Sequence, residues 1–221
     1  MYDPHFEATV AEIRGFDLGD DTDLLAHLEA CPDEALTGQQ WLLRGVLLHR
    51  AGRDDDALDC LEHAAEQGHD RSRALYLKSC VVRNAGRMGD ALEALQEARE
   101  AAREDELVPV ADLDHAQGLL YWRVGNLEDA LSQVDRALEQ DDGSAARWLH
   151  RGQLLAELAR PDEARKAFDR ALLEEQDLDL AMFERAALEA SQADAECAAQ
   201  WLTKAVRIEP AHSLAAAEDA R

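Results

Sequence analysis

The residues best suited to chemistry are two short motifs that combine acidic residues with histidine. In EHAAE, residues 62–66, His63 and Glu66 stand three positions apart, which puts both side chains on one helix face where they could hold a metal ion. No second such pair faces them in this register, so an ordinary solvated helix face explains the motif. In DLDH, residues 112–115, the acidic side chains stand at a predicted helix start, where they favour the helix dipole. We therefore predict no metal site and no cofactor.

Other signatures of catalysis are missing from the sequence or have simpler explanations. It contains no phosphate-binding glycine loop, no His-Glu-x-x-His zinc motif and no nucleophile elbow. The acidic run at residues 54–56 begins a predicted helix, where N-capping accounts for it. No Cys-x-x-Cys pair occurs, so we expect reduced thiols at Cys31, Cys60, Cys80 and Cys197. Three of them are expected to pack as small apolar residues, and for Cys80 a reactive role is the alternative to lining the groove. These observations predict a protein that is not an enzyme.

Composition and charge narrow the class of partner. The chain has 221 residues, of which 47% are hydrophobic, so it can bury a sizeable core. Its 47 acidic residues outnumber its 23 lysines and arginines and give a formal net charge of −24. Such a surface repels phosphate groups, so we expect no nucleic-acid partner and no membrane partner. The stretch MYDPHFEATVAEIRGFDLGDD lacks the basic flank and apolar run of a signal peptide, which predicts a cytoplasmic location.

The sequence contains five copies of one repeating unit. Small residues recur at steps of 34, 39, 34 and 34 positions, at Gly45, Ser79, Gly118, Gly152 and Ala186. Seven positions after each stands another small residue, where a helix end needs a left-handed conformation: Gly52, Gly86, Gly125, Ala159 and Ala193. Two alanine series follow in phase, at Ala57, Ala91, Ala130, Ala164 and Ala198 and at Ala64, Ala98, Ala137, Ala171 and Ala205. The spacing predicts two helices per unit, joined by a short turn.

The small residues have a physical role in this pattern. Two antiparallel helices can cross at short distance only where the side chains at the crossing are tiny. Large apolar residues fill the space beside the crossing, among them Trp41 and Trp148 in first helices and Leu61 and Phe168 in second helices. One helix pair cannot bury both of its faces, so each pair must stack on the next. The sequence therefore predicts an all-α solenoid of antiparallel helix pairs.

The pattern resembles the tetratricopeptide repeat (TPR) family, whose unit carries an aromatic, a small residue, a large residue, a turn glycine and two alanines in this order. The resemblance covers roughly residues 38–210 and is strongest in QWLLRGVLLHRAGRDDDALDCLEHA, QGLLYWRVGNLEDALSQVDRALEQ and RWLHRGQLLAELARPDEARKAFDRA. It implies a right-handed α-solenoid, a TPR-like superhelix. We expect one domain with a degenerate N-terminal capping helix pair, five repeats and a C-terminal capping helix or tail, at 1–37, 38–71, 72–110, 111–144, 145–178, 179–211 and 212–221.

The sequence departs from the repeat pattern at several places, and each departure leads to a structural expectation. The 39-residue step predicts a longer second helix in the second repeat, followed by a loop near Pro109. Glu189 stands where a large apolar residue is expected, so we expect looser packing in the fifth repeat. Asp23 and His27 stand at positions that should be small and apolar, which is why residues 1–37 are assigned to a degenerate cap.

One polar residue precedes the first small residue of every repeat. With so many carboxylates available, we expect these residues to form salt bridges between adjacent repeats rather than to contact a ligand: Arg44, Lys78, Gln117, Arg151 and Arg185.

The resemblance implies that the first helices line the concave side, and the register identifies the side chains that point into it. The predicted peptide-binding groove consists of Arg50, Arg73, Tyr76, Arg83, Asn84, His115, Trp122, Arg123, His150 and Gln153. No carboxylate stands at the groove positions before Glu157 and Glu184, so we expect a neutral to basic groove, with Cys80 as a small apolar liner. The competing explanation is that the groove has no binding role. Its arginines and aromatic residues would then stand there only because the acidic residues occupy the outer face.

We expect Arg83 and Arg123 to lie exposed at the groove rim and Tyr76 and Trp122 to supply apolar contact area. The predicted function is a non-enzymatic adaptor or scaffold that binds a partner segment with acidic and aromatic or apolar groups. Tetratricopeptide domains that hold the C-terminal carboxylate of chaperones use a lysine and asparagine clamp, whereas the matching positions here include Leu42, Val46 and Leu77. The alternative function is a structural assembly protein that forms homo-oligomers through its terminal repeats or convex face.

Overall fold

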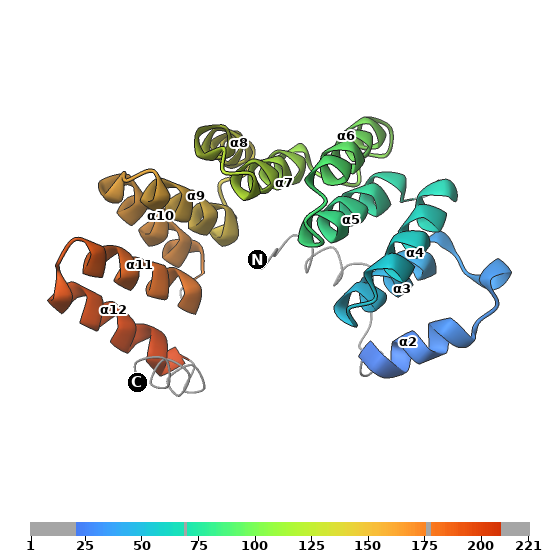
Figure 1. Ribbon diagram of the computed structural model, residues 1–221, viewed down its shortest axis with the longest axis horizontal. Helices are drawn as coiled ribbons and strands as arrows, with labels where there is room; N and C mark the ends of the chain where they lie inside the picture. The colour runs from blue at the N-terminus through green and yellow to red at the C-terminus, as the bar shows by residue number, and fades with distance from the viewer. Residues whose placement is uncertain (1–20, 69, 176–177, 209–221) are drawn as a thin grey trace. The chain divides into compact units, whose positions relative to one another are not determined.

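The structure, a computed structural model, describes residues 21–68, 70–175 and 178–208, and every regular element in these ranges is helical (Figure 1). The described elements are α2 (Asp21–Ala30), the 3₁₀ helix η1 (Asp33–Ala35), α3 (Gly38–Arg50), α4 (Asp54–Glu66), α5 (Arg71–Asn84), α6 (Met88–Asp105), α7 (Val110–Arg123), α8 (Leu127–Gln140), α9 (Ala145–Glu157), α10 (Pro161–Glu174), α11 (Asp179–Ser191) and α12 (Ala195–Ile208). The all-α prediction is confirmed. The tail predicted at 212–221 and residues 1–20 of the predicted cap lie outside the described residues.

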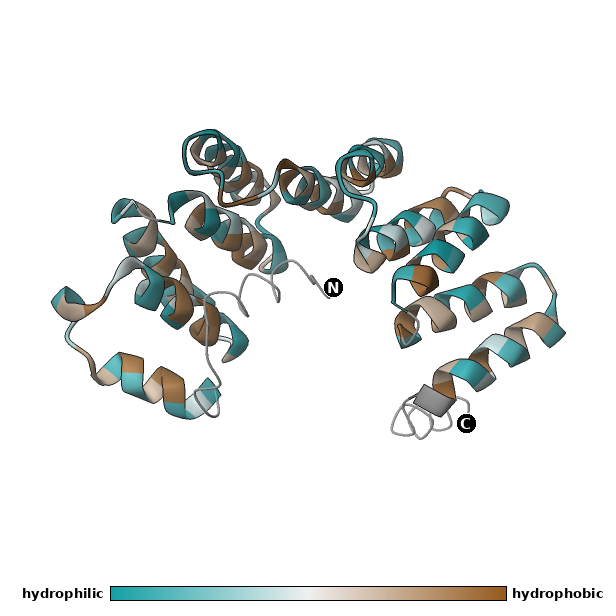
Figure 2. Ribbon diagram, turned by 180° about the vertical axis from the view of Figure 1, so that it is seen from behind, coloured by the Kyte–Doolittle hydropathy of each residue, from teal (hydrophilic) through white to brown (hydrophobic). Residues whose placement is uncertain are grey.

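The chain divides into two compact units, residues 1–124 and residues 125–221. In the first unit each helix from α2 to α7 packs against the next, and in the second unit the same holds from α8 to α12. Short turns join α3 to α4 and α5 to α6, so the two members of each pair run antiparallel. Hydrophobic and hydrophilic residues mark different sides of the helices (Figure 2). Buried leucines form the core of the first unit, including Leu42, Leu61, Leu77, Leu95 and Leu113.

The predicted turn residues have the predicted conformation. The backbone dihedral φ is positive at all five positions: Gly52 (74°), Gly86 (80°), Gly125 (81°), Ala159 (56°) and Ala193 (63°). At the first turn the amide of Arg53 donates to the carbonyl oxygen of Leu48 at 2.9 Å, which satisfies a carbonyl left open where α3 ends. The turn in each repeat therefore contains one left-handed residue, as the seven-residue spacing predicts.

The small residues that define the repeat lie where two helices approach closely. In the second unit, a Cβ atom at Gly152 of α9 would come 2.5 Å from Cε1 of Phe168 in α10, and Phe168 is fully buried. In the first unit, a Cβ atom at Gly45 of α3 would come 3.0 Å from Cγ of Leu61 in α4. A side chain cannot enter such a crossing without displacing its neighbour.

Helix α6 contains most of the extra residues of the 39-residue step. This helix has 18 residues, whereas α4 has 13, and it is followed by Glu106, whose φ is 54°. Pro109 immediately precedes α7. The extension packs back on α5, because the hydroxyl of Ser72 donates to Oδ1 of Asp105 at 2.7 Å. The predicted longer helix and the loop near Pro109 are both confirmed.

The row of polar residues that precedes the small positions bridges adjacent repeats. Lys78 of α5 pairs with Glu62 of α4 at 2.6 Å, and Arg151 of α9 pairs with Asp135 of α8 at 2.6 Å. The other members follow the same rule: Arg185 pairs with Asp169 at 3.3 Å, Arg44 with Asp33 at 3.0 Å, and Gln117 accepts from Arg99 at 3.1 Å. Each contact joins a first helix to the element before it. The predicted salt bridges between repeats are confirmed for Lys78, Arg151 and Arg185, whereas Arg44 pairs with η1 and Gln117 forms a hydrogen bond.

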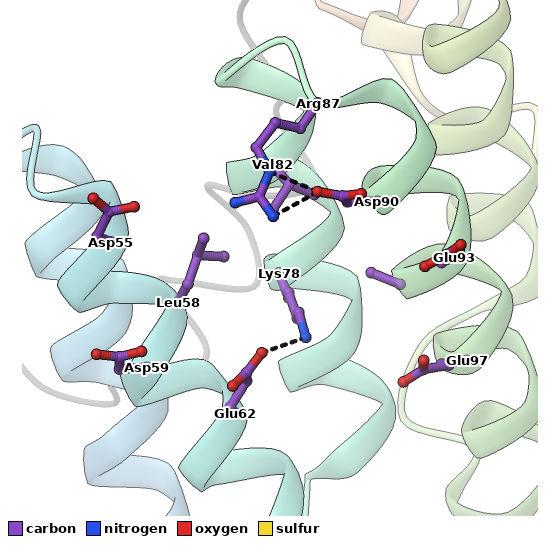
Figure 3. Close-up of a pocket in the computed structure, with 11 residues that line it drawn as sticks. Asp55, Leu58, Asp59, Glu62, Lys78, Val82, Arg87, Asp90, Glu93 and Glu97 are labelled. Carbon is purple, nitrogen blue, oxygen red and sulfur yellow. Dashed lines mark hydrogen bonds and ion pairs between the residues drawn. The ribbon is translucent and has the colours of Figure 1, made fainter.

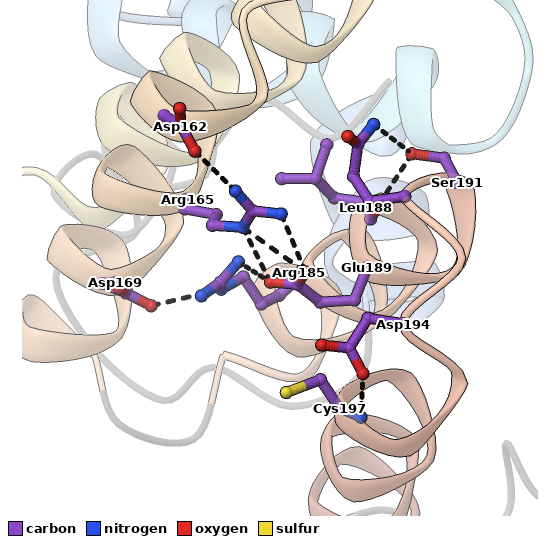
Figure 4. Close-up of polar contacts among 10 residues, drawn as sticks. Asp162, Arg165, Asp169, Arg185, Leu188, Glu189, Ser191, Asp194 and Cys197 are labelled. Carbon is purple, nitrogen blue, oxygen red and sulfur yellow. Dashed lines mark hydrogen bonds and ion pairs between the residues drawn. The ribbon is translucent and has the colours of Figure 1, made fainter.

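The sequence predicts loose packing around Glu189, but the structure shows a buried and well-bonded side chain there. Its side chain is buried, and its carboxylate accepts hydrogen bonds from Nε and Nη2 of Arg165 in α10, both at 3.0 Å (Figure 4). Nη1 of Arg185, one turn earlier in α11, donates to the same carboxylate. The hydrogen bonds of Arg165 hold the pKa of Glu189 below its usual value. An ion-pair cluster therefore fills the space that a large apolar residue fills in the other repeats.

Candidate functional site

Helix α5 separates two faces of the first unit. Lys78 and Val82 line a groove of about 440 Å³ between α4 and α6, which we call the outer groove (Figure 3). A helix turns about 100° per residue, so Tyr76, Cys80 and Arg83 point to the opposite side of α5. We call that side, which α3, α5 and α7 form, the inner face. It is the side that the sequence assigns to peptide binding.

The outer groove carries most of its charge as carboxylates. Lys78 is bound to Glu62, and Nε of Arg87 donates to Asp90 at 2.6 Å (Figure 3). The remaining charged residues of the lining are all acidic: Asp55, Asp59, Glu93 and Glu97. The two faces of α5 therefore differ in charge, and the strongly acidic one lies opposite the predicted binding residues.

The predicted site residues fall in both units. Arg50 ends α3, Arg73, Tyr76, Arg83 and Asn84 lie on α5, and His115, Trp122 and Arg123 lie on α7. Because α5 contacts both α3 and α7, the first unit brings these eight residues onto adjacent helices. A hydrogen bond of 3.4 Å between Nδ2 of Asn84 and Nε2 of His49 links α5 to α3 on this side.

The two remaining predicted residues lie on α9 of the second unit. His150 is buried there, and the amide of Gln153 donates to Oε1 of Glu184 in α11 at 2.7 Å. Gln153 is thus hydrogen-bonded to Glu184, which the sequence analysis places at a position of the same groove. His150 and Gln153 therefore belong to a surface formed by α9 and α11. The inner face consists of the eight residues on α3, α5 and α7.

The inner face is more buried than the sequence indicates. Tyr76 and His115 are 1% exposed, and Arg83 is only 3% exposed. The expectation that Arg83 lies at a water-exposed rim is therefore wrong, because its position near the end of α5 is covered by other parts of the protein. Arg123 is exposed as expected, Arg50 is also exposed, and Trp122 is partly exposed. The face combines buried aromatic and cationic groups with exposed arginines at its edge.

Besides Asp70, which lies 3.9 Å from Arg73, two carboxylates reach the inner face, which corrects the expectation of a face free of acidic groups at this end. Oδ2 of Asp21, the first residue of α2, lies 2.9 Å from Nη1 of Arg50. Oδ1 of Asp54, the first residue of α4, lies 2.6 Å from Nδ1 of His49. Neither carboxylate belongs to a first helix, so a register of the first helices alone could not place them. The arginines Arg83 and Arg123 are further along the face.

Thiol and metal chemistry find little support in the described residues. No disulfide joins the four cysteines. Burial raises the pKa of Cys60 to about 11, and a hydrogen bond with Asp194 raises the pKa of Cys197, so both thiols stay protonated at neutral pH. No cluster of three or more His, Cys, Asp or Glu side chains suited to a metal ion occurs in the described part of the chain. Among the helices described, none combines the length and apolarity needed to span a membrane.

Comparisons with known proteins agree on the repeat. A model of the tetratricopeptide repeat family matches residues 115–179. No curated protein matches the sequence. Among solved structures, TTC0263, a TPR protein of Thermus thermophilus, is 25% identical with a TM-score of 0.65, and the alignment covers 79% of this chain and 92% of that chain.

Two further solved structures share the fold over almost the whole chain. BtubC from P. vanneervenii is 20% identical with a TM-score of 0.68, covering 95% of this chain and 90% of that chain. YrrB, described as a TPR protein with an unusual peptide-binding site, is 20% identical with a TM-score of 0.57, covering 92% of this chain and 99% of that chain. The repeat register and the family match at residues 115–179 agree with the shared helix-pair fold, so the chain is similar to proteins of the tetratricopeptide repeat family.

Proposed function

We propose that this protein is an interaction scaffold whose inner face binds an extended or helical segment of a partner protein. The observation that carries the proposal is the chemistry of that face, where the partly exposed Trp122 lies beside the exposed Arg123 on α7, next to α5 with the buried Tyr76. Aromatic residues and arginine contribute most to binding energy at protein interfaces, and guanidinium groups bind carboxylates through charge-assisted hydrogen bonds. The expected segment therefore carries acidic and aromatic or apolar side chains.

Two observations support a peptide ligand over a small molecule. The residues of the face are spread over three parallel first helices, α3, α5 and α7, which suits an elongated ligand that contacts several repeats in turn. YrrB, which shares the fold, is described as having a peptide-binding site. Among the described residues, the face offers no cluster of His, Cys, Asp or Glu side chains that could hold a metal ion.

Replacing Trp122 with alanine is expected to weaken binding of the partner segment by at least about 30-fold. Truncating a desolvated aromatic anchor typically costs about 2 kcal/mol or more, whereas an exposed arginine is worth roughly 0.2 to 1 kcal/mol. The segment is identified by affinity capture and peptide mapping, and its affinity is then measured by isothermal titration calorimetry at two salt concentrations. Trp122→Ala should bind weakly at both concentrations.

Charge variants locate the electrostatic part of the interaction. Arg123→Glu should weaken binding at low salt and reduce its salt dependence, because Arg123 is exposed at the edge of the inner face. Arg87→Glu is the matched control, since Arg87 is also exposed but lines the outer groove. Equal effects of these two reversals, or wild-type affinity for Trp122→Ala, would place the binding site elsewhere.

A second candidate function is assembly into homo-oligomers, and exposed apolar residues of the second unit favour it. Leu173 is 69% exposed on α10, and Leu202 is 43% exposed on α12. Light scattering over a range of protein concentrations separates the two functions. A stable oligomer that Leu202→Glu dissolves would support assembly, and a monomer at all concentrations would leave the scaffold as the proposed function.

A further inference from the structure

The extra residues of the 39-residue step line a pocket at the end of α6. Helix α6 begins at Met88, 34 positions after α4 begins at Asp54, so the last residue of α4, Glu66, corresponds to Glu100. Residues 101–105 therefore form an additional turn of α6. This turn, the loop that follows it and the first turn of α7 surround a pocket of about 500 Å³ within residues 99–113, which we call the α6–α7 pocket.

Hydrogen bonds and ion pairs fix both sides of the α6–α7 pocket. The carboxylate of Asp105 accepts from the amide of Ser72 at 3.0 Å and from its hydroxyl at 2.7 Å, so the additional turn is held against α5. Nη1 of Arg99 lies 2.9 Å from Oδ1 of the fully buried Asp114, which ties α6 to α7. A site that is already formed loses little conformational entropy when a ligand binds.

Apolar side chains make up most of the lining. Leu113 and Val108 are buried, whereas Val110 is 51% exposed. Ala102 and Pro109 also line the pocket. Covering such a surface is favourable because it removes apolar area from water. The lining therefore favours a ligand with an apolar body.

Arg103 supplies a cationic group that is available to a ligand. Arg99 is bound to Asp114 and donates to Gln117 at 3.1 Å. Arg103, one turn later, is exposed, and its side chain has no hydrogen bond or ion pair with any other residue that the structure describes. The one carboxylate of the lining is that of Glu106. With two arginines and one glutamate, the lining differs in sign from the chain as a whole, whose formal charge is −24, and it favours an anion.

We propose that the α6–α7 pocket binds a small organic anion, in which a carboxylate is attached to an aromatic or branched aliphatic body. The carboxylate pairs with Arg103, and the body covers Val108 and Val110. Pockets for small molecules typically measure about 300 to 1,000 Å³ and combine an apolar lining with a few polar groups. The lining comes from one short stretch of chain, which suits a compact ligand rather than a segment that contacts several repeats. The pocket shares no residue with the inner face, so this inference is independent of the proposed function.

A titration with three related probes tests the ligand chemistry. The full-length protein with labelled valine and leucine methyl groups is followed by nuclear magnetic resonance during addition of phenylbutyrate, whose Kd is expected to be about 1 mM. The methyl signals of Val108, Val110 and Leu113 should shift and saturate. Phenylbutyramide should bind about threefold to fivefold more weakly because it is uncharged, and butyrate at least about tenfold more weakly because it lacks the ring. Phenylbutyrate that leaves these methyl signals unchanged would overturn the inference.

Charge variants test whether Arg103 holds the carboxylate. Arg103→Ala should weaken phenylbutyrate binding about threefold to fivefold and leave phenylbutyramide binding unchanged. Glu106→Gln removes the carboxylate of the lining and should tighten phenylbutyrate binding about twofold. Arg87→Ala is the matched control, because Arg87 is an exposed arginine that precedes the other end of α6. Equal affinities of Arg103→Ala and Arg87→Ala for phenylbutyrate would reject the inference.

Two exposed valines at opposite ends of α7 test the apolar contact. Val110 begins α7, and Val124, which is 57% exposed, follows its last residue. Val110→Asp should weaken phenylbutyrate binding at least about tenfold, because it removes apolar area and adds a like charge. Val124→Asp makes the same change away from the pocket and should bind like the wild type. Circular dichroism checks that both variants are folded, and equal binding by the two would contradict the proposed site.

A blocked peptide separates a small-molecule ligand from a segment of a partner protein. N-acetyl-Asp-Phe-Asp-amide carries carboxylates and a phenyl ring on a peptide backbone. It should bind at least about fivefold more weakly than phenylbutyrate, because the backbone on both sides of the ring does not fit a compact pocket. A peptide that shifts the methyl signals of Val108 and Val110 with equal or higher affinity would show that a partner segment occupies the pocket, and the small-molecule assignment would be wrong.

Discussion

Replacing Glu189 with glutamine is expected to lower the free energy of unfolding by about 2 to 3 kcal/mol at neutral pH. Breaking a fully buried ion pair by removing one partner costs about 3 to 5 kcal/mol, because the other charge stays buried and uncompensated. At this site two arginines lose their shared carboxylate, but Arg185 keeps its pair with Asp169, and Arg165 keeps its pair with Asp162 and its contact with water. The expected cost is therefore somewhat below the range for a fully buried pair. Urea unfolding followed by circular dichroism measures the difference.

The effect of this variant should depend on pH in one direction. The pKa of Glu189 is lowered in the folded protein, so its stabilising contribution is present above the unfolded pKa of about 4.3 and is lost as the pH falls through the folded pKa. The difference between wild type and Glu189→Gln should thus be constant near neutral pH and shrink below about pH 4. Glu163→Gln is the control, because its pair with Arg160 is exposed to water and should contribute little. A difference that persists unchanged at low pH would contradict the ionic origin of the effect.

Replacing Gly152 with alanine is expected to destabilise the second unit by about 1 to 3 kcal/mol, the usual cost of overpacking a core. The added Cβ atom would lie 2.5 Å from one ring atom of Phe168 and 2.6 Å from another, and the buried ring has no free space to enter. Helices α9 and α10 must therefore move apart, which weakens the packing of the whole pair. The midpoint of thermal unfolding gives the measurement.

A glycine in an open position provides the control for this variant. Gly89 lies in the first turn of α6, and a Cβ atom there would meet nothing within 4 Å. Gly89→Ala should leave stability unchanged or raise it by up to about 1 kcal/mol, because alanine restricts the unfolded chain more than glycine does. If Gly152→Ala melts like Gly89→Ala, the helix crossing is not as close as the repeat pattern requires.

The fold could be predicted from the sequence because its main determinants are local and recur in phase. Gly52 and Ala159 mark turns that need a left-handed residue, and Gly45 and Gly152 mark crossings that exclude a side chain. Each of these constraints acts within one helix pair. Aligning the repeats once is therefore enough to locate all of these turns and crossings in the sequence. The extra residues of the 39-residue step could likewise only extend the second helix or the loop that follows it, and α6 takes most of them.

The environment of the candidate site could be predicted only in part, because it depends on groups from outside the first helices. The register placed Tyr76 and Arg83 on one side of α5, but it could not show that Arg83 is buried. Asp21 and Asp54 reach the inner face from α2 and α4, which a count along the first helices cannot include. Glu189 was expected to loosen its repeat because the sequence does not reveal which arginines lie close enough in space to bind it.

The most direct test of the central claim is to ask which face of the first unit touches the partner. p-Benzoylphenylalanine is placed at Asn84, which is exposed on the inner face, or at Glu93, which lines the outer groove, and each full-length protein is irradiated in a native lysate. The account predicts a partner adduct from position 84 that Trp122→Ala abolishes, and no such adduct from position 93. A partner that crosslinks from position 93 and not from position 84 would contradict it.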